Sequence, residues 1–201
     1  MTHDRSPSDI TDVTQLVLHE RRSRDRGWWD AQRECFAPDS TVRVSWFRGT
    51  GADFVTESEK LAANGEDATH SVGPPVVDLH RDRALAEVPC HMELRTHLDD
   101  TPVMLSCHAR LLYRAERRSD EWLIASLDAV YERDAVTPHV PGTRLHLDEE
   151  KLATFRPSYR MLAYLLGQRG YSIAEDLYGD DRPEHVAALH RSAWTWLRNG
   201  R

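Results

Sequence analysis

The chain has 201 residues, of which 40% are hydrophobic and 29% are charged, a balance typical of a soluble globular protein. Its formal net charge of −7 argues against general nucleic-acid binding, which requires a positive surface. The longest uninterrupted apolar run covers residues 161–166, far short of the ~20 residues of a membrane span, and residues 1–5 lead into no signal-peptide core, so we expect no membrane partner.

The N-terminal residues predict two helices. From Ser8 to Gly27, apolar side chains recur at helical spacing behind a Ser-Asp cap, and Gly27 either ends or kinks this helix. Residues 28–36 predict a second, short helix. The Ala-Pro-Asp-Ser sequence at 37–40 then predicts a turn before the first strand.

From residue 41 onward, period-two alternation predicts a series of strands, with a helix at 54–63. The expected strands cover residues 41–47, 69–79 with an interruption at 73–75, 84–96, 103–113 and 122–133. One face of these strands is apolar. His91 and His108 fall on the other face, so they point away from any interior pocket, and they could instead line an oligomer interface.

Helices that come first and long strands that follow indicate an α+β fold, in which a curved antiparallel sheet wraps around the N-terminal helices. Such a sheet leaves room for an interior cavity. Residues 134–150 are interpreted as a polar linker. Two further helices, 157–168 and one that begins near Pro183, form a C-terminal extension that either covers the cavity or packs on a sheet.

The chain contains three cysteines, Cys35, Cys90 and Cys107, and no two of them have the C-x-x-C spacing. We therefore expect free thiols in a reducing cytoplasm and no structural metal. There is no H-E-x-x-H motif and no Gly-rich phosphate loop, so no cofactor is expected. Only Lys60 and Lys151 among the 26 basic residues are lysines, a bias that suggests a GC-rich bacterial source.

Several motifs together resemble the SnoaL-like proteins of the nuclear transport factor 2-like (NTF2-like) superfamily. The opening helix leads into Asp25-Arg26-Gly27 and Trp29-Asp30, Phe36 is followed by Pro38-Asp39, and Thr69-His70-Ser71 stands before the long strands. The final strand, with Trp122-Leu123-Ile124, leads to Arg133-Asp134 and Thr137-Pro138. The resemblance implies a cone-shaped α+β domain over residues 1–140, a helical extension over 141–201, and a homo-oligomer, either a dimer or a trimer.

In the scytalone dehydratase and dehydrochlorinase branch of this superfamily, an Asp at the end of the first helix orients a His that acts as the base. The resemblance places Asp25 and His70 in these roles. A neutral imidazole can accept a proton near pH 7, and a carboxylate on its far nitrogen fixes the tautomer. The structural alternative is that Asp25 pairs with a neighbouring arginine and that His70 lies at the surface.

The resulting hypothesis is a cofactor-independent lyase or isomerase that acts on a small hydrophobic or polycyclic molecule by dehydration or a related elimination. The alternatives are a noncatalytic ligand-binding protein or subunit, and a polyketide cyclase or epoxide hydrolase. Glu20 is either a second carboxylate at the pocket mouth or a surface partner of Arg24. The candidate substrate-binding residues are Val17, Glu20, Arg21, Trp46, Val88, Cys90, Met92, Leu105, Cys107 and Leu127.

Overall fold

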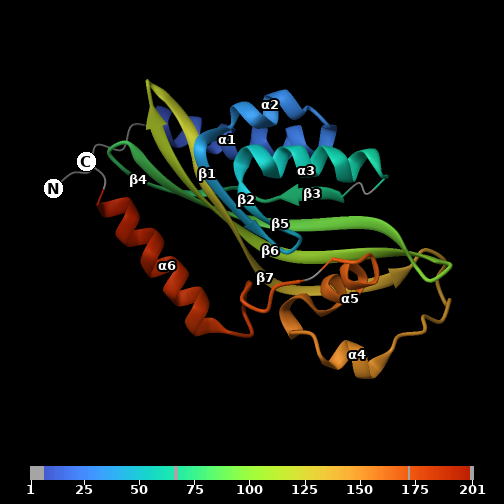
Figure 1. Ribbon diagram of the computed structural model, residues 1–201. Coiled ribbons are helices and arrows are strands. Elements are labelled where there is room, and N and C mark those ends of the chain that lie inside the picture. Colours follow the sequence, from blue (N-terminus) through green and yellow to red (C-terminus); the bar gives the residue numbers. More distant parts are fainter. Residues whose placement is uncertain (1–6, 66–67, 172, 200–201) are drawn as a thin grey trace.

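The computed structural model describes residues 7–65, 68–171 and 173–199 (Figure 1). The first residues of the expected domain 1–140 and the last two residues of the extension 141–201 lie outside these described residues. The helices are α1 (Pro7–Arg26), α2 (Trp29–Glu34), α3 (Gly51–Ala63), α4 (Glu149–Ala153), the 3-10 turn η1 (Pro157–Tyr159), α5 (Arg160–Gln168) and α6 (Pro183–Arg198).

One sheet contains all the strands of the described residues. They are β1 (Phe36–Val44), β2 (Phe47–Thr50), β3 (Ala68–Val72), β4 (Val76–His80), β5 (Arg83–Leu98), β6 (Thr101–Arg118), β7 (Glu121–Pro138) and β8 (Tyr178–Gly179). Their order is β2-β1-β7-β6-β5-β3, and β4 and β8 pair with β5 and β7. The sheet is antiparallel, as expected, except that β1 and β8 run parallel to β7.

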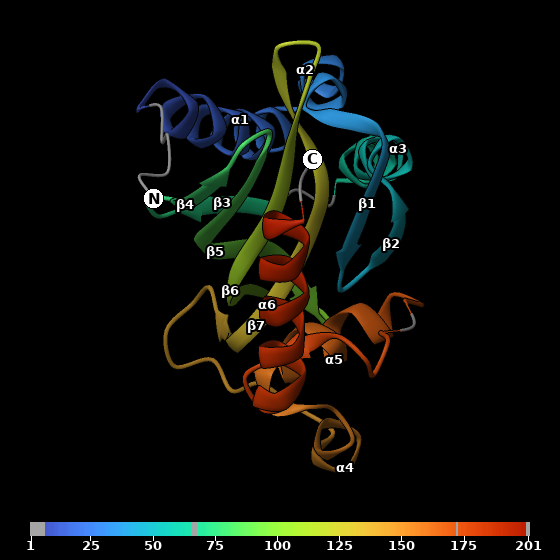
Figure 2. The same cartoon turned by 90° about the vertical axis from the view of Figure 1, so that its left-hand side faces the viewer.

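The long strands β5, β6 and β7 bend around the N-terminal helices. Helices α1, α2 and α3 lie on one side of the sheet, and α6 lies on the other (Figures 1 and 2). The pairing of β6 with β7 shifts register after His108 and after Arg114, and such bulges increase the local twist and bend of a sheet. The hollow face of this curved sheet is therefore turned toward α1 and α3.

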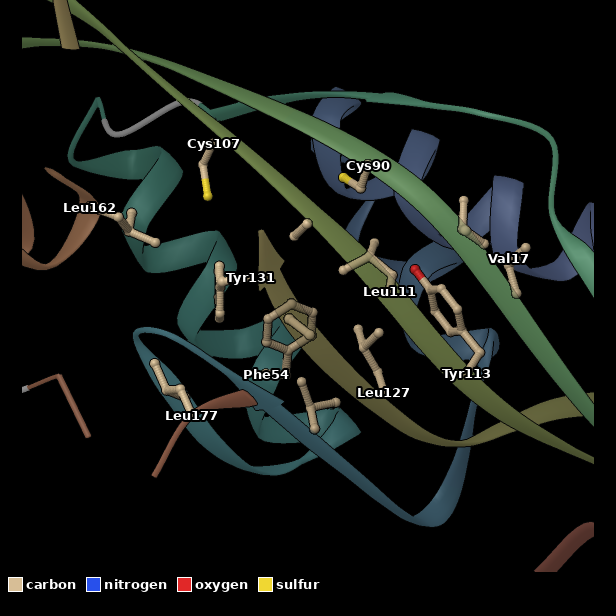
Figure 3. Packing of buried hydrophobic residues seen from close by; sticks show 14 of the residues in the cluster. Val17, Phe54, Cys90, Cys107, Leu111, Tyr113, Leu127, Tyr131, Leu162 and Leu177 are labelled. Atoms are coloured by element: carbon tan, nitrogen blue, oxygen red, sulfur yellow. The ribbon is translucent and has the colours of Figure 1, made fainter. Parts of the chain in front are cut away.

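Alternation along the strands places one set of apolar side chains in this hollow. Phe54 of α3 and Leu111, Leu127 and Tyr131 of the strands lie together between the sheet and the helices (Figure 3). Phe54 and Leu127 are each only 1% exposed. Burying a side chain of this size contributes about 1.5–3 kcal/mol, so this cluster holds the helices against the sheet.

The C-terminal segment packs on both faces of the sheet. Helix α6 buries Leu189, Ala193 and Leu197 against residues of the outer sheet face, and Arg83 lies over the ring of Trp196. Helix α5 lies beside β7, where the Asp134 carboxylate accepts a hydrogen bond of 2.7 Å from the backbone N–H of Leu162. An acceptor in the first turn of a helix stabilises its N-terminus, so β7 fixes where α5 begins.

The sequence prediction of a turn at residues 37–40 was wrong, because these residues belong to β1. The pairing of β1 with β7 shifts between Phe36 and Thr41, so the Pro-Asp sequence produces an irregularity within the strand and not its end. The strand expected over residues 41–47 ends at Val44, and residues 47–50 form the separate short strand β2.

The prediction that a linker begins at residue 134 was also wrong, because β7 continues to Pro138 opposite Val103 of β6. Residues 134–138 of the expected linker thus lie on a strand paired with β6, whereas residues 139–148 form neither helix nor strand. Residues 149–153, at the end of the expected linker, form α4, with the side chain of Asp148 as its N-cap.

Among the described residues, none of the helices combines the length and the hydropathy that a membrane crossing requires. The expected cytoplasmic location stays a prediction, as do the homo-oligomer and the division of the chain at residue 140.

A substitution at Gly51, the first residue of α3, tests how closely that helix packs on β1. A Cβ at this position would lie 2.6 Å from Cδ1 of Phe36 and would also meet the hydroxyl of Ser40, both on β1. We expect Gly51→Ala to lower the free energy of unfolding by about 1–3 kcal/mol, because the two elements must separate. Urea denaturation measures the change.

Gly167→Ala is the matched control, because the nearest side-chain atom to its Cβ would be Cζ of Phe155 at 3.9 Å. This substitution within α5 should leave stability unchanged or raise it by up to ~1 kcal/mol through helix propensity. Equal effects of the two substitutions would contradict the packing argument.

Candidate active site

A cavity lies in the hollow of the sheet, below α1 and α3 and against the inner faces of β3, β5, β6 and β7. The space open to the centre of a water molecule is about 100 Å³, whereas a single water needs roughly 10–15 Å³. Most of the wall is apolar, and the aromatic members of the wall are Trp46, Phe54, Tyr131 and Tyr171. A small, largely hydrophobic molecule fits such a wall.

Asp25, near the end of α1, holds His70 of β3 with both of its carboxylate oxygens. Oδ1 of Asp25 lies 2.7 Å from the ring Nδ1 of His70, and Oδ2 accepts a 2.7 Å hydrogen bond from the backbone N–H of His70. Both side chains are nearly buried, with exposed fractions of 15% and 11%. His70 is opposite Met92 of β5, and both side chains line the cavity.

The electrostatic surroundings keep this pair as a carboxylate and a neutral imidazole. Burial lowers the pKa of His70 to about 4, with help from the positive charges of Arg24 and Arg21 and against the attraction of Asp25. Burial by itself would raise the pKa of Asp25, but its bonds to His70 lower it below the ordinary value. Nδ1 therefore carries the proton that bonds Asp25, and Nε2 keeps a free lone pair at neutral pH.

A second polar group lies one turn earlier on α1. Arg21 donates from Nε and Nη2 to the two oxygens of Glu20, at 2.5 Å each, and Glu20 also accepts hydrogen bonds from Gln32 and Tyr113. Glu20 is 0% exposed. Burial by itself would raise the pKa of Glu20, but the charge and hydrogen bonds of Arg21 lower it, so the pair is ionised.

Arg21 is nevertheless part of the cavity wall, as is Arg24. Residues 21 and 25 are four apart and so lie on the same face of α1. The fixed charge of Arg21 therefore stands close to His70, where it opposes formation of an imidazolium and attracts an anion.

The structure brings some of the predicted residues together at the cavity. His70, Arg21, Trp46, Cys90, Met92 and Cys107 line it, and Asp25 lies directly behind His70. The side chains of Cys90 and Cys107 come from neighbouring strands (Figure 3). Burial raises the pKa of the Cys90 thiol to about 11 and raises that of Cys107 further, so both are protonated.

The other predicted substrate-binding residues do not line the cavity. Val17, Glu20, Val88, Leu105 and Leu127 are buried in the surrounding core or, for Glu20, in its ion pair. The alternation of each strand correctly gave the inward face, but it does not say how far along the strand the cavity extends. Glu20 is neither at the cavity mouth nor paired with Arg24 at the surface, the two alternatives that its sequence position left open.

Several wall residues were missed by the sequence prediction. Tyr131 continues the inward alternation of Leu127 and Ala129 on β7, so the pattern could have indicated it. Leu162 and Leu166 of α5 and Tyr171 come from the C-terminal segment, and no local pattern shows that this segment reaches the cavity.

His91 and His108 lie on the strand face opposite the cavity, where their rings stack with centroids 4.3 Å apart. Over the described parts of the chain, there is no cluster of three or more His, Cys, Asp or Glu side chains that could hold a metal ion.

Comparison with known proteins identifies a family. The model of the SnoaL-like domain matches residues 5–128. A PEP2-like protein from the fungus Fusarium vanettenii is 26% identical over 205 residues, which cover 91% of this chain and 87% of that protein. This relative is fungal, so the arginine bias of the composition is poor support for the expected bacterial source.

Two solved structures show the same fold. A type 2 hexachlorocyclohexane dehydrochlorinase superposes with a TM-score of 0.56 at 10% identity, covering 70% of this chain and 95% of its own. A putative scytalone dehydratase from Novosphingobium aromaticivorans gives a TM-score of 0.53 at 14% identity, with 69% and 96% covered. The expected NTF2-like fold is thus confirmed.

The buried ion pair predicts a large stability loss on removal of its anion. Glu20→Gln leaves Arg21 buried without a countercharge, which we expect to cost about 3–5 kcal/mol in urea denaturation. Glu57→Gln is the control, because its ion pair with Lys60 lies on exposed side chains and should be worth less than ~1 kcal/mol. Losses of similar size in the two variants would show that Glu20 is not the countercharge.

His70 should titrate with a pKa of about 4, as followed by the ring shifts in NMR spectra, against ~6.5 for an exposed histidine. In Asp25→Asn this pKa should fall further, because the carboxylate that favours the imidazolium is gone. A titration near 6.5 in both proteins would mean a solvated histidine without a partner.

The lowered pKa of His70 makes the free energy of unfolding depend on pH. Between pH 6.5 and 4 the unfolded chain binds a proton at residue 70 that the folded chain does not, so the free energy of unfolding falls as pH is lowered through this window. His70→Gln should remove this part of the pH dependence, measured by denaturation across that range. An unchanged profile in the variant would assign the dependence to other groups.

Proposed function

Because this chain belongs to the SnoaL-like family, we propose that it is a cofactor-independent lyase or isomerase in which the pair of Asp25 and His70 removes a proton from a small hydrophobic or polycyclic substrate. The observation that carries the proposal is the 2.7 Å contact between Asp25 and His70 at the wall of an apolar cavity.

The role of His70 follows from its protonation state. Its Nε2 holds a lone pair at neutral pH, and Asp25 stabilises the positive charge that develops when a proton arrives. A substrate C–H bond in the cavity would lose its proton to Nε2, and the bonding pair would remain on the substrate. An imidazole with a low pKa is a weak base, so the substrate proton must itself be acidic, as it is next to a carbonyl group.

An elimination also requires stabilisation of the leaving group, and Arg21 can supply it. Its guanidinium stands near His70 and lines the cavity, while Glu20 holds it in place through two hydrogen bonds. The fixed cation would attract a leaving group that departs with negative charge, whether hydroxide or halide. The two solved structures named above are of a dehydrochlorinase and a putative dehydratase, which are eliminating enzymes, and this is compatible with the same reaction class.

A noncatalytic ligand-binding protein is the competing function. It needs a cavity but has no use for a buried, oriented base. The double attachment of His70 to Asp25 and the open space beside it favour catalysis over binding alone.

Proton abstraction can be tested without knowledge of the natural substrate. 2-Tetralone is a small aromatic ketone whose C1 hydrogens are acidic. In D₂O at neutral pH the protein should accelerate their exchange for deuterium, followed by ¹H NMR. We expect His70→Gln and Asp25→Asn to reduce this acceleration by about 10²–10⁴-fold, the usual contribution of a general base.

His91→Gln is the matched control, because His91 lies on the face of the sheet opposite the cavity and should leave exchange unchanged. If the protein binds 2-tetralone and exchange is no faster than in buffer, the binding function is favoured and catalysis by the pair is rejected.

A further inference from the structure

The charged side chains at the end of α1 are arranged so that the positive ones reach the cavity. Glu20, Arg21, Arg24 and Asp25 are all buried or nearly buried, with side chains at most 15% exposed. Arg21 and Arg24 belong to the cavity wall, whereas Glu20 is bonded within the core and Asp25 lies behind His70. The cavity therefore presents positive charge on a wall of low polarity, which attracts an anion.

Arg24 and His70 are next to the same atom. Oδ1 of Asp25 lies 3.9 Å from Nη1 of Arg24 and 2.7 Å from Nδ1 of His70. The positive charge of Arg24 also lowers the pKa of His70 more than that of Arg21 does, as expected for a near neighbour. A ligand group bound to Arg24 at the cavity wall therefore lies beside the imidazole.

The two arginines differ in what holds them. Arg21 donates from Nε and Nη2 to Glu20, and its guanidinium lies 5.9 Å from the ring centroid of Phe54. The contact of Arg24 with Asp25 is the longer ion pair of 3.9 Å. A guanidinium carries five N–H donors in one plane, and two of them match the two oxygens of a carboxylate. Arg24 can thus pair with a ligand carboxylate in addition to its contacts within the protein.

The rest of the cavity wall limits the ligand to a small ring system with a single negative charge. The rings of Trp46 and Phe54 lie with centroids 5.5 Å apart, and both belong to the wall, as do the rings of Tyr131 and Tyr171. Such surfaces pack well against a planar ring. Because most of the wall is apolar, a group with two negative charges, such as a phosphate, would lose more hydration than two guanidinium groups replace.

We propose that Arg24 binds a carboxylate group of the substrate, which makes the substrate a small aromatic or polycyclic acid and not a neutral molecule. The inference rests on the proposed function, because it names the substrate class of the same site. Arg24 is a binding residue that holds the carboxylate beside His70. The C–H bond that loses its proton therefore lies at the same end of the substrate as the carboxylate, and Arg21 serves the leaving group.

A pair of ligands that differ in charge alone tests the contact. 2-Naphthoate and 2-naphthamide have the same ring system and nearly the same shape. Isothermal titration calorimetry at pH 7 should show that the wild-type protein binds the carboxylate about 10–100-fold more tightly, the usual effect of a hydrogen bond between charged groups. Arg24→Gln should abolish this preference and change the affinity for the amide only a few-fold. Arg24→Lys, which keeps the charge without the planar fork, should retain part of the preference.

Arg22→Gln is the matched control, because it removes the same charge from the same helix. Arg22 is exposed, and its guanidinium lies over the ring of Trp28, outside the cavity wall. The affinities for both ligands should stay unchanged. A loss of carboxylate affinity equal to that in Arg24→Gln would assign the preference to the net charge of the helix and overturn the proposal.

The pKa of His70 in the wild-type protein gives a second readout, which needs no variant that folds. A carboxylate held by Arg24 places a negative charge beside the imidazole, so the pKa of His70, about 4 in the free protein, should rise by about 1–3 when 2-naphthoate is bound. Bound 2-naphthamide should not raise it. A merely structural role of Arg24 would not make the pKa of His70 depend on the charge of the ligand.

The outcomes separate this inference from the proposed function. Equal affinities for the two ligands, a preference that survives in Arg24→Gln, or tighter binding of 2-naphthyl phosphate than of 2-naphthoate overturns the carboxylate class. Failure of the wild-type protein to bind 2-naphthoate at millimolar concentration overturns it as well. Because deuterium exchange of 2-tetralone tests the base separately, a carboxylate preference without exchange supports the role of Arg24 and rejects that of His70.

Discussion

Asp25 ties the first helix to the edge of the sheet, and the arrangement of the cavity depends on this contact. One carboxylate oxygen bonds the ring of His70 and the other bonds its backbone N–H. Within the described residues, strand β3 pairs with β5 alone, so no strand is hydrogen-bonded to its outer edge. The Asp25 carboxylate supplies an acceptor there. The same contact sets the tautomer of His70, and therefore which nitrogen meets the cavity.

The charged groups around the cavity are paired with one another. Glu20 neutralises the positive charge of Arg21, and the carboxylate of Asp25 is hydrogen-bonded to the imidazole of His70. Neighbouring residues of a helix do not face each other, but the long side chain of Arg21 folds back to reach Glu20. The ion pair is buried, and Glu20 also accepts hydrogen bonds from Gln32 and Tyr113, so the guanidinium of Arg21 is held beside the cavity.

The C-terminal segment contributes part of the cavity wall. The family match ends at residue 128, within β7, yet Leu162, Leu166 and Tyr171 lie on the cavity wall. Asp134, near the end of β7, fixes the start of α5 through its bond to the backbone of Leu162. Part of the cavity wall is therefore built from residues that lie outside the matched domain.

Periodicity in the sequence determined the order of the main helices and long strands and the inward face of each long strand, because periodicity is a local property. The pairing of Asp25 with His70 was implied by the family resemblance. Tertiary structure decided the rest. The depth of the cavity along each strand excluded Val88, Leu105 and Leu127 from its wall and included Tyr131. The burial of Glu20 depended on Gln32 and Tyr113, which lie 12 and 93 residues away. The linker expected at residue 134 became strand because β6 was long enough to pair with it. In each case the deciding contact came from a distant part of the chain, which no local pattern encodes.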